Sequence, residues 1–272
     1  MRIITYNVNS VRERLRAVRR VVRKYAPDVL CLQETKVEDG SFPVDGFADL
    51  GLTELRIAGQ KAYNGMAIVT PHAIRRTWSH DLCGLGEKRH LAVELASGLE
   101  IHNLYVPAGG DKPDPLVNAR FAKKLDFLQA MARWMRRWPE RSTRPRVLLG
   151  DLNVAPLPSD VWDHRKMRRS VTHTEVEVAL LEEAMRALPW TDLLRRVVPA
   201  EDALFTWWSY RARDWQKVNK GRRLDHVWVS APLADRIEDC AVATEVRGWK
   251  RPSDHAPVIV DLDWNEPARQ PA

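Results

Sequence analysis

The chain has 272 residues, with 43 Lys and Arg against 36 Asp and Glu, a formal net charge of +7 at pH 7 and a pI near 9.5. This length can bury a sizeable core in one large domain or two small ones, and the basic balance favours polyanionic partners such as nucleic acid without specifying one. The N-terminus MRIITYNVNS has no apolar signal core, no later apolar run approaches about 18 residues, and the three cysteines show no CxxC spacing, so we expect a cytoplasmic protein outside any membrane.

Apolar runs bounded by turn signals predict the β-strands, in chain order. The predicted strands cover residues 2–8, 27–34, 64–70, 90–95, 99–107, 146–154, 224–230 and 255–264. Between them, helical spacing of apolar residues predicts helices over 10–25, 118–138 and 174–188. The pairs Ser10 with Glu13 and Thr174 with Glu177 have the spacing of capping boxes. Many strands with fewer helices indicate a layered α/β sandwich.

The strand-like run PRVLLGDLNVAP, residues 145–156, ends in an acid and an amide two residues apart. Residues i and i+2 of an extended strand point the same way, so Asp151 and Asn153 should share one face. Taken alone, this segment is better explained as a strand end followed by a turn, because Gly, Asp and Asn favour turns.

Other predicted strands also begin or end in polar residues. These residues are Asn7, Asn9, Glu34, Tyr105, Asp225, Asp254 and His255. Each alone has the ordinary interpretation of a cap or turn residue, but together they are what one site at the edge of a sheet requires. Because they span nearly the whole chain, we expect one catalytic domain over residues 1–264, followed by a disordered tail, 265–272.

The sequence resembles a family at this point, through YNVNSVR, PDVLCLQETK, GQKAYNGMAIV, NLYVP, LLGDLNVAP, FTWWSY, GRRLDHVWVS and PSDHAPVIV, in this order. It is similar to the exonuclease III type of apurinic/apyrimidinic (AP) endonuclease, within the DNase I-like endonuclease/exonuclease/phosphatase superfamily. The resemblance implies a four-layer αββα sandwich, with two packed β-sheets and helices outside. It also implies a Mg²⁺-dependent DNA repair nuclease that cuts 5′ of an abasic site and leaves a 3′-hydroxyl, with 3′→5′ exonuclease or 3′-end trimming activity.

Hydrolysis of a phosphodiester requires negative charge to be offset, and oxygen ligands suit Mg²⁺, with Mn²⁺ as an alternative. By resemblance, Glu34 is the principal metal ligand, assisted by Asn7 and Asp254, while Asp151 and Asn153 are a possible second metal site. Asn9 is neutral where some relatives carry Asp, which should make the site depend more on Glu34.

The resemblance also gives roles to the catalytic residues. Asp151 would orient or deprotonate the attacking water, and Asn153 would position that water or the phosphate. Asp225 would fix the tautomer of His255 and favour its charged form, and Tyr105 would donate a hydrogen bond near the phosphate or leaving group. The identity of the general base and the number of metals stay open.

The segment FTWWSYRARDWQKVNKGRR, residues 205–223, combines aromatic surfaces with cationic groups, as nucleic-acid-binding segments do. By resemblance, Trp207 lines the pocket for the base-less sugar, with help from Leu224, and Asn9 contributes to substrate binding. The helix over residues 10–25 is better explained as a solvated cationic face, although Arg12, just after the first strand, could touch a phosphate.

Two departures from relatives put the balance between abasic-site incision and exonuclease activity in doubt. Arg222 replaces a bulky apolar pocket residue and should add phosphate affinity outside the pocket, and Ala108 replaces an amide. The expected partner is double-stranded DNA with abasic sites or blocked 3′ ends, bound by a monomer. The alternatives are another phosphohydrolase of the superfamily and a non-catalytic DNA-binding module on the same fold.

Overall fold

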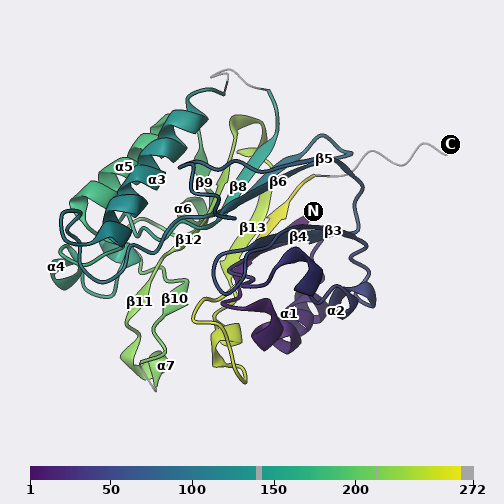
Figure 1. Cartoon of the computed structure of the whole chain (residues 1–272), viewed down its shortest axis with the longest axis horizontal. Helices are drawn as coiled ribbons and strands as arrows, with labels where there is room; N and C mark the ends of the chain where they lie inside the picture. Colours follow the sequence, from purple (N-terminus) through teal and green to yellow (C-terminus); the bar gives the residue numbers. More distant parts are fainter. Residues whose placement is uncertain (139–142, 212–213, 265–272) are drawn as a thin grey trace.

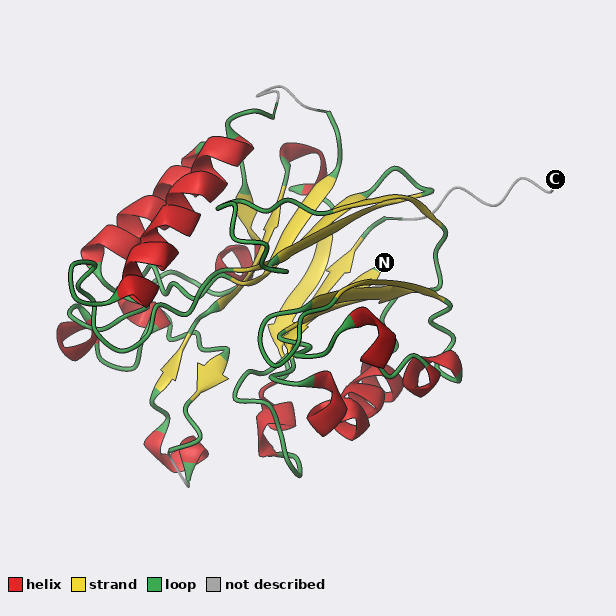
Figure 2. Cartoon of the chain, viewed as in Figure 1, coloured by secondary structure: helices red, strands yellow, loops and turns green. Residues whose placement is uncertain are grey.

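Two six-stranded β-sheets pack face to face, and helices cover both outer faces (Figures 1 and 2). This computed structural model describes residues 1–138, 143–211 and 214–264. The arrangement confirms the predicted α/β four-layer sandwich. The predicted disordered tail, 265–272, lies outside the described residues.

The first sheet has the strand order β13-β14-β1-β2-β4-β3. Its strands are β13 (Ile237–Val242), β14 (Val258–Leu262), β1 (Arg2–Asn7), β2 (Val29–Gln33), β4 (Met66–Thr70) and β3 (Glu54–Ala58). β1 is parallel to β2 and antiparallel to β14. The C-terminal ends of β1 and β2 therefore lie beside the residues that precede β14.

The second sheet has the order β5-β6-β7-β8-β12-β9. Its strands are β5 (Ile74–Trp78), β6 (His90–Leu95), β7 (Glu100–Tyr105), β8 (Arg146–Asp151), β12 (Asp225–Val229) and β9 (Thr191–Asp192). β7 is parallel to β8, with Tyr105 opposite Asp151, and β12 is antiparallel to β8, with Asp225 opposite Asp151. This register brings three polar strand ends to one edge.

The helices form the two outer layers, and α3 and α5 lie on the side opposite α1 and α2 (Figure 1). They are α1 (Val11–Tyr25), α2 (Asp45–Ala48), α3 (Ala119–Met135), α4 (His164–Met167), α5 (Glu175–Arg186), α6 (Leu193–Val197) and α7 (Trp215–Val218). Short 3-10 turns cover Asp39–Ser41, Pro158–Asp160, Ala231–Leu233 and Thr244–Gly248. None of the helices in the described part of the chain is long and apolar enough to span a membrane.

The main core lies between the sheets, where apolar side chains such as Ile3, Met66, Leu91 and Val147 are almost fully buried. A buried polar bridge crosses this core. Gln33 Nε2 donates to Asn103 Oδ1 at 2.6 Å, and Asn103 Nδ2 donates to main-chain oxygens of the first sheet at 3.0 and 3.2 Å. If the sheets shifted, these buried groups would lose their hydrogen bonds and no water could replace them. The bridge therefore favours one alignment of the two sheets.

The predicted helix starts differ in how they are capped. Thr174 and Glu177 form the predicted capping box at the start of α5. Ser10 precedes α1 but makes no side-chain capping bond, because its backbone has φ 90° and its N–H donates to the main-chain oxygen of Glu34 at 2.7 Å. The prediction of a capping box at Ser10 was therefore wrong, and the residue instead joins α1 to the end of β2.

Candidate active site

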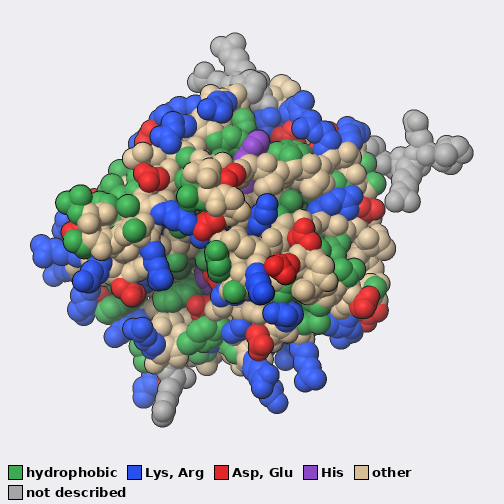
Figure 3. All heavy atoms as spheres, in the orientation of Figure 1, with side chains coloured by type: hydrophobic (Ala, Val, Ile, Leu, Met, Phe, Trp, Pro, Cys, Tyr) green, Lys and Arg blue, Asp and Glu red, His purple; other side chains and the backbone are tan. Residues whose placement is uncertain are grey.

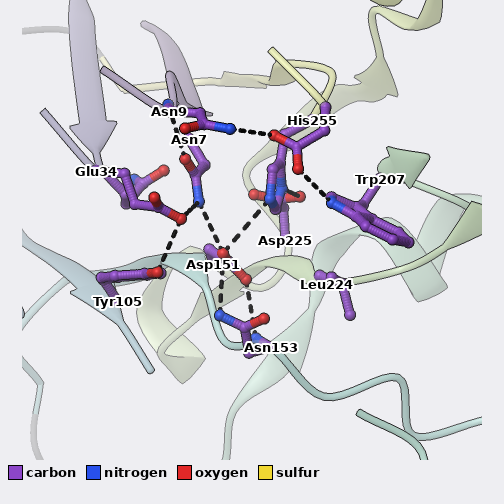
Figure 4. A network of polar contacts seen from close by, with 12 residues as sticks. Asn7, Asn9, Glu34, Tyr105, Asp151, Asn153, Trp207, Leu224, Asp225 and His255 are labelled. Carbon is purple, nitrogen blue, oxygen red and sulfur yellow. Dashed lines mark hydrogen bonds and ion pairs between the residues drawn. The ribbon is translucent and has the colours of Figure 1, made fainter. Parts of the chain in front are cut away.

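The polar residues predicted at strand ends meet at one edge of the two sheets (Figure 4). One group comes from β1, β2 and β7, and the other comes from β8, β12 and the turn before β14. Asn7 joins the groups, because its Nδ2 donates to Glu34 Oε1 at 2.9 Å and to Asp151 Oδ2 at 2.8 Å. The register described above thus assembles one site from both sheets.

Glu34 is held by neighbours that favour its charged form. Tyr105 donates its hydroxyl to Glu34 Oε1 at 2.8 Å, and Lys36 Nζ lies 2.8 Å from Glu34 Oε2. Burial alone would raise the pKa of Glu34, but Lys36 and the donors Asn7 and Tyr105 outweigh burial and lower the pKa. Glu34 has a left-handed backbone, with φ 52°.

Asp151 and Asn153 do meet, although they do not share a strand. β8 ends at Asp151, and Asn153 has a left-handed backbone with φ 53°. Asn153 Nδ2 donates to Asp151 Oδ2 at 3.1 Å and to the main-chain oxygen of Val106 at 2.9 Å. Gly150 lets β8 lie close to β7 just before this turn, because a Cβ there would lie 2.0 Å from the main-chain oxygen of Leu104. The two side chains lie together, as the sequence predicted, but a turn after β8 brings them together and not an extended strand.

His255 lies between two carboxylates. Its Nδ1 is 2.8 Å from Asp225 Oδ2, and its Nε2 is 3.6 Å from Asp151 Oδ2. Burial lowers the pKa of His255, but the carboxylates of Asp225 and Asp151 outweigh burial and raise the pKa to about 10. Burial, together with the charges of Asp225 and Glu34, raises the pKa of Asp151 to about 7. The histidine is therefore cationic at neutral pH.

Asp254 connects the site to an aromatic wall. Trp207 Nε1 donates to Asp254 Oδ2 at 2.9 Å, and Asn9 Nδ2 donates to Asp254 Oδ1 at 3.0 Å. Burial raises the pKa of Asp254, but His255 and these two donors lower it below its ordinary value. Lys36 Nζ donates to Asn9 Oδ1 at 2.6 Å, so Asn9 links Asp254 to the pair of Glu34 and Lys36.

A cavity of about 500 Å³ opens over these groups. Its lining includes the acidic residues Glu34, Asp151 and Asp254 together with His255. The lining also includes aromatic and basic residues, which are Trp162, Trp207, Arg211, Lys220 and Arg222. Leu224 and Ala108 also line the cavity. Arg12 lines a separate surface groove beside α1, so the structure does not bring it into the site.

Arg222 corrects one prediction. It was expected to act outside the pocket, but it forms part of the pocket wall. β10 (Trp207–Trp208) pairs with β11 (Gly221–Arg222) so that Trp207 is directly opposite Arg222. The guanidinium carbon lies 5.1 Å from the centre of the Trp207 ring, which makes a cation–π contact.

The donor set fits a divalent cation that prefers oxygen ligands. Four carboxylates, those of Glu34, Asp151, Asp225 and Asp254, gather around two cations, Lys36 and His255. Asp225 Oδ1 is buried and has no hydrogen-bond partner in the described part of the chain. Asp151, Asp225 and His255 each offer a ligand atom within 4.8 Å of the others. The carboxylate oxygens are the better ligands for such an ion, because His255 Nδ1 is already held by Asp225.

Comparison with known proteins agrees with this geometry. A model described as the Endonuclease/Exonuclease/phosphatase family matches residues 4–255. The chain belongs to this family. Exodeoxyribonuclease III of Haemophilus influenzae is 30% identical over 273 residues, which cover 96% of this chain and 100% of the relative. The family and the enzyme class predicted from the sequence are thereby confirmed.

Two solved structures of the family are similar over nearly their whole length. An AP endonuclease from Archaeoglobus fulgidus superposes with a TM-score of 0.88 at 30% identity, covering 97% of this chain and 99% of the other. A Neisseria 3′ phosphatase bound to a product DNA hairpin also has a TM-score of 0.88, at 33% identity, covering 97% of this chain and 100% of the other. The chain is a phosphodiesterase of the exodeoxyribonuclease III and AP endonuclease type.

Two lysines of this family member take part in the site although sequence reasoning gave them no role. Lys36 pairs with Glu34, as described above, and its place in LQETK was a signal that could have found it. Lys124 is fully buried, lies 2.5 Å from Glu177 and donates to the main-chain oxygen of Asn153 at 2.6 Å. No local pattern in the sequence distinguishes Lys124 from other helix lysines.

The contact between His255 and Asp225 should stabilise the metal-free protein at neutral pH, and this contribution should be lost at alkaline pH. The folded protein raises the pKa of His255 from 6.5 to about 10, so this contribution to stability is fully present below pH 6.5 and is lost as the pH rises towards 10. The pKa of Asp151 is also raised, from 3.8 to about 7, so its contribution to stability is lost as the pH rises through that lower range. Denaturant midpoints with chelator should therefore fall more steeply above pH 7 for wild type than for His255→Asn. Equal slopes would contradict the assignment.

Proposed function

We propose that the protein is a Mg²⁺-dependent DNA repair nuclease that hydrolyses the phosphodiester 5′ of an abasic site, leaves a 3′-hydroxyl and also trims 3′ ends. The observation that supports this most directly is the position of His255. A cationic histidine held by Asp225 faces Asp151 in a cavity that also contains Glu34 and an aromatic wall. We assign the activity to one catalytic domain, residues 1–264.

The acidic residues of the cavity, with Asn153 and His255, suit attack by water on a phosphate. Asp151, with a pKa of about 7, can accept a proton from water near neutral pH. Both N–H groups of the Asn153 amide are already used, so its Oδ1 is the atom available to accept a hydrogen bond from that water. His255 offers its Nε2 proton to a phosphate oxygen, and Asp225 keeps the ring oriented.

Glu34, Asn7 and Asp254 would hold the magnesium, with Mn²⁺ as an alternative, and Asp151 with Asn153 would contribute to a second metal. The bound ion would offset negative charge on the phosphate and the leaving oxygen. Burial and the charges of Glu34 and Asp151 raise the pKa of Tyr105 well above its ordinary value, so its hydroxyl stays protonated and orients Glu34. A direct bond from Tyr105 to the phosphate stays a prediction.

The substrate would be double-stranded DNA with an abasic site or a blocked 3′ end. The surface carries many Lys and Arg side chains, several of them around a hollow in the face drawn in Figure 3. Trp207 and Leu224 form part of a cavity next to the phosphate site, where a sugar without a base would fit. We propose that the protein acts as a cytoplasmic monomer.

The function is tested with one duplex prepared with and without a single abasic analogue. The purified protein should cut the abasic strand on its 5′ side in the presence of Mg²⁺, cut the intact duplex far less, and lose both activities when a chelator is added. Equal cutting of both duplexes would favour a general phosphodiesterase of the family. Binding without cutting would favour the non-catalytic module.

Trp207→Ala should reduce selectivity more than chemistry. The variant removes one wall of the pocket and the hydrogen bond to Asp254, whereas Asp151, Asn153 and His255 remain in place. We expect the preference for abasic over intact duplex to fall by about tenfold or more, or ~1.4 kcal/mol, because the pocket that excludes a normal nucleotide loses one wall. The measurement is kcat/KM on the two matched duplexes. Trp264→Ala is the control, because Trp264 packs against the main core and does not line the cavity.

A further inference from the structure

Arg222 presents an incompletely paired cation to the pocket. Its Nη1 donates to the main-chain oxygen of Val171 at 3.1 Å and to Thr172 Oγ1 at 3.0 Å. Its Nε is buried without a hydrogen-bond partner, and its Nη2 donates to no group in the described part of the chain. The neutral acceptors fix the guanidinium in place and leave donors unused.

Arg222 and its neighbour Arg223 differ in whether a carboxylate balances their charge. Arg223, the next residue, pairs with Asp160 and Asp192, at 2.8 and 2.6 Å. Arg222 forms no ion pair with any carboxylate in the residues that the structure describes, and Glu177, whose charge acts on it, is already bound to Lys124. A partly buried guanidinium without a counter-ion is unfavourable, so the pocket gains most from a ligand that supplies negative charge and acceptor oxygens.

Arg222 also differs from the other cations of the cavity. Lys220 and Arg211 are exposed, and the Lys220 ammonium lies 4.6 Å from the centre of the Trp162 ring, where it can contact a DNA backbone from outside. Arg222 is only partly exposed, and it lies against the wall formed by Trp207. Arg222 is therefore placed to contact the part of the substrate that enters the pocket, whereas Lys220 and Arg211 are placed to contact the DNA backbone outside it.

We propose that Arg222 binds an anionic group on the fragment released with the phosphate, so that the pocket selects 3′ ends blocked by a second acid, such as a phosphoglycolate, over a neutral sugar. This inference rests on the proposed function. In the reaction, the oxygen of water bonds to phosphorus, the bond from phosphorus to O3′ of the strand breaks, and O3′ takes a proton. The strand regains its 3′-hydroxyl, and the phosphate leaves with the glycolate.

The anion has two possible sources, and two pairs of duplexes separate them. The first pair ends in a 3′-phosphoglycolate or in its neutral counterpart, a 3′-phosphate ester of ethylene glycol. The second pair ends in a tetrahydrofuran nucleotide that carries either a 3′-phosphate or a 3′-hydroxyl. A preference in the first pair identifies a terminal carboxylate as the ligand, and a preference in the second identifies the phosphate that follows an abasic sugar.

The test compares dissociation constants for these duplexes in the presence of chelator, so that it does not depend on cleavage. Wild type should bind the anionic member of at least one pair about tenfold more tightly, as a charge-assisted hydrogen bond allows. Arg222→Met should reduce that ratio to about twofold or less, whereas Arg222→Lys should retain only part of it, because an ammonium keeps the charge but not the planar donor fork. Arg186→Met, on the exposed face of α5, is the control for net charge and should behave as wild type.

Two results would overturn the proposal: equal binding of both members in both pairs by wild type, or an unchanged preference in Arg222→Met. Cleavage with Mg²⁺ is measured separately on the same duplexes. If none is cleaved while the binding preference depends on Arg222, the proposed function fails and the anion site stands. If all are cleaved but binding shows no preference that depends on Arg222, the anion site fails and the proposed function stands.

Discussion

Replacing Asp151 with asparagine is expected to lower the turnover number on an abasic duplex by about 10²-fold or more. Asparagine keeps the shape of the side chain, but it cannot accept the proton of the attacking water. The site also loses the carboxylate that faces His255 Nε2 at 3.6 Å. Single-turnover cleavage at saturating protein measures this effect without a contribution from binding.

The matched control is Asp263→Asn, because Asp263 is exposed and lies outside the site. It should cleave at the wild-type rate. The circular dichroism spectrum of Asp151→Asn should match that of wild type, because the substitution preserves the buried volume. If Asp151→Asn cleaves at a near-normal rate at neutral pH, the general base lies elsewhere, and the pair of His255 and Asp225 becomes the candidate.

Glu34→Ala should lower turnover by about 10²-fold or more while changing DNA affinity little. Glu34 is the proposed metal ligand, and removing it also leaves Lys36 without its carboxylate partner. DNA affinity comes mainly from Lys and Arg contacts with phosphates, which this variant retains. Cleavage rates over a Mg²⁺ series, with binding measured in parallel, separate the two effects, and excess Mg²⁺ should restore part of the rate.

Glu38→Ala is the control for this variant, because Glu38 is exposed and only four residues away. It should show the wild-type dependence on Mg²⁺. The metal assignment would be wrong if wild-type incision survived a chelator, or if Glu34→Ala lost DNA affinity as strongly as it lost turnover.

The strands that the sequence predicted are the central strands of the two sheets. Those that it missed include β3, β5 and β13, and each of these forms the edge of its sheet. Edge strands face solvent along one side, so they carry charged residues and lack a continuous apolar run. The segment IRRTW of β5, for example, is largely exposed. The hydrophobic pattern of the sequence therefore predicted the central strands but not these edge strands.

The site was predictable where polar residues interrupt apolar strands, as at Glu34, Asp151 and Asp225. It was not predictable where the role of a residue depends on a distant partner. Lys124 becomes part of the site only because α3 and α5 bring it to Glu177 beneath Asn153. Arg222 enters the pocket because the pairing of β10 with β11 places it opposite Trp207. Such pairings are set by tertiary structure and leave no local signature.

The place of β1 in its sheet has a consequence for the protein during its synthesis. β1 is made first, but it lies between β2 and β14, and the main-chain bonds on its β14 side can form only after residues 258–262 have been made. His255 and Asp254 come from the same late segment. A growing chain that has left the ribosome up to β12 would therefore contain Asp151 and Asp225 without His255, their cationic partner. We expect such a fragment not to cut DNA, because it lacks the histidine of the site.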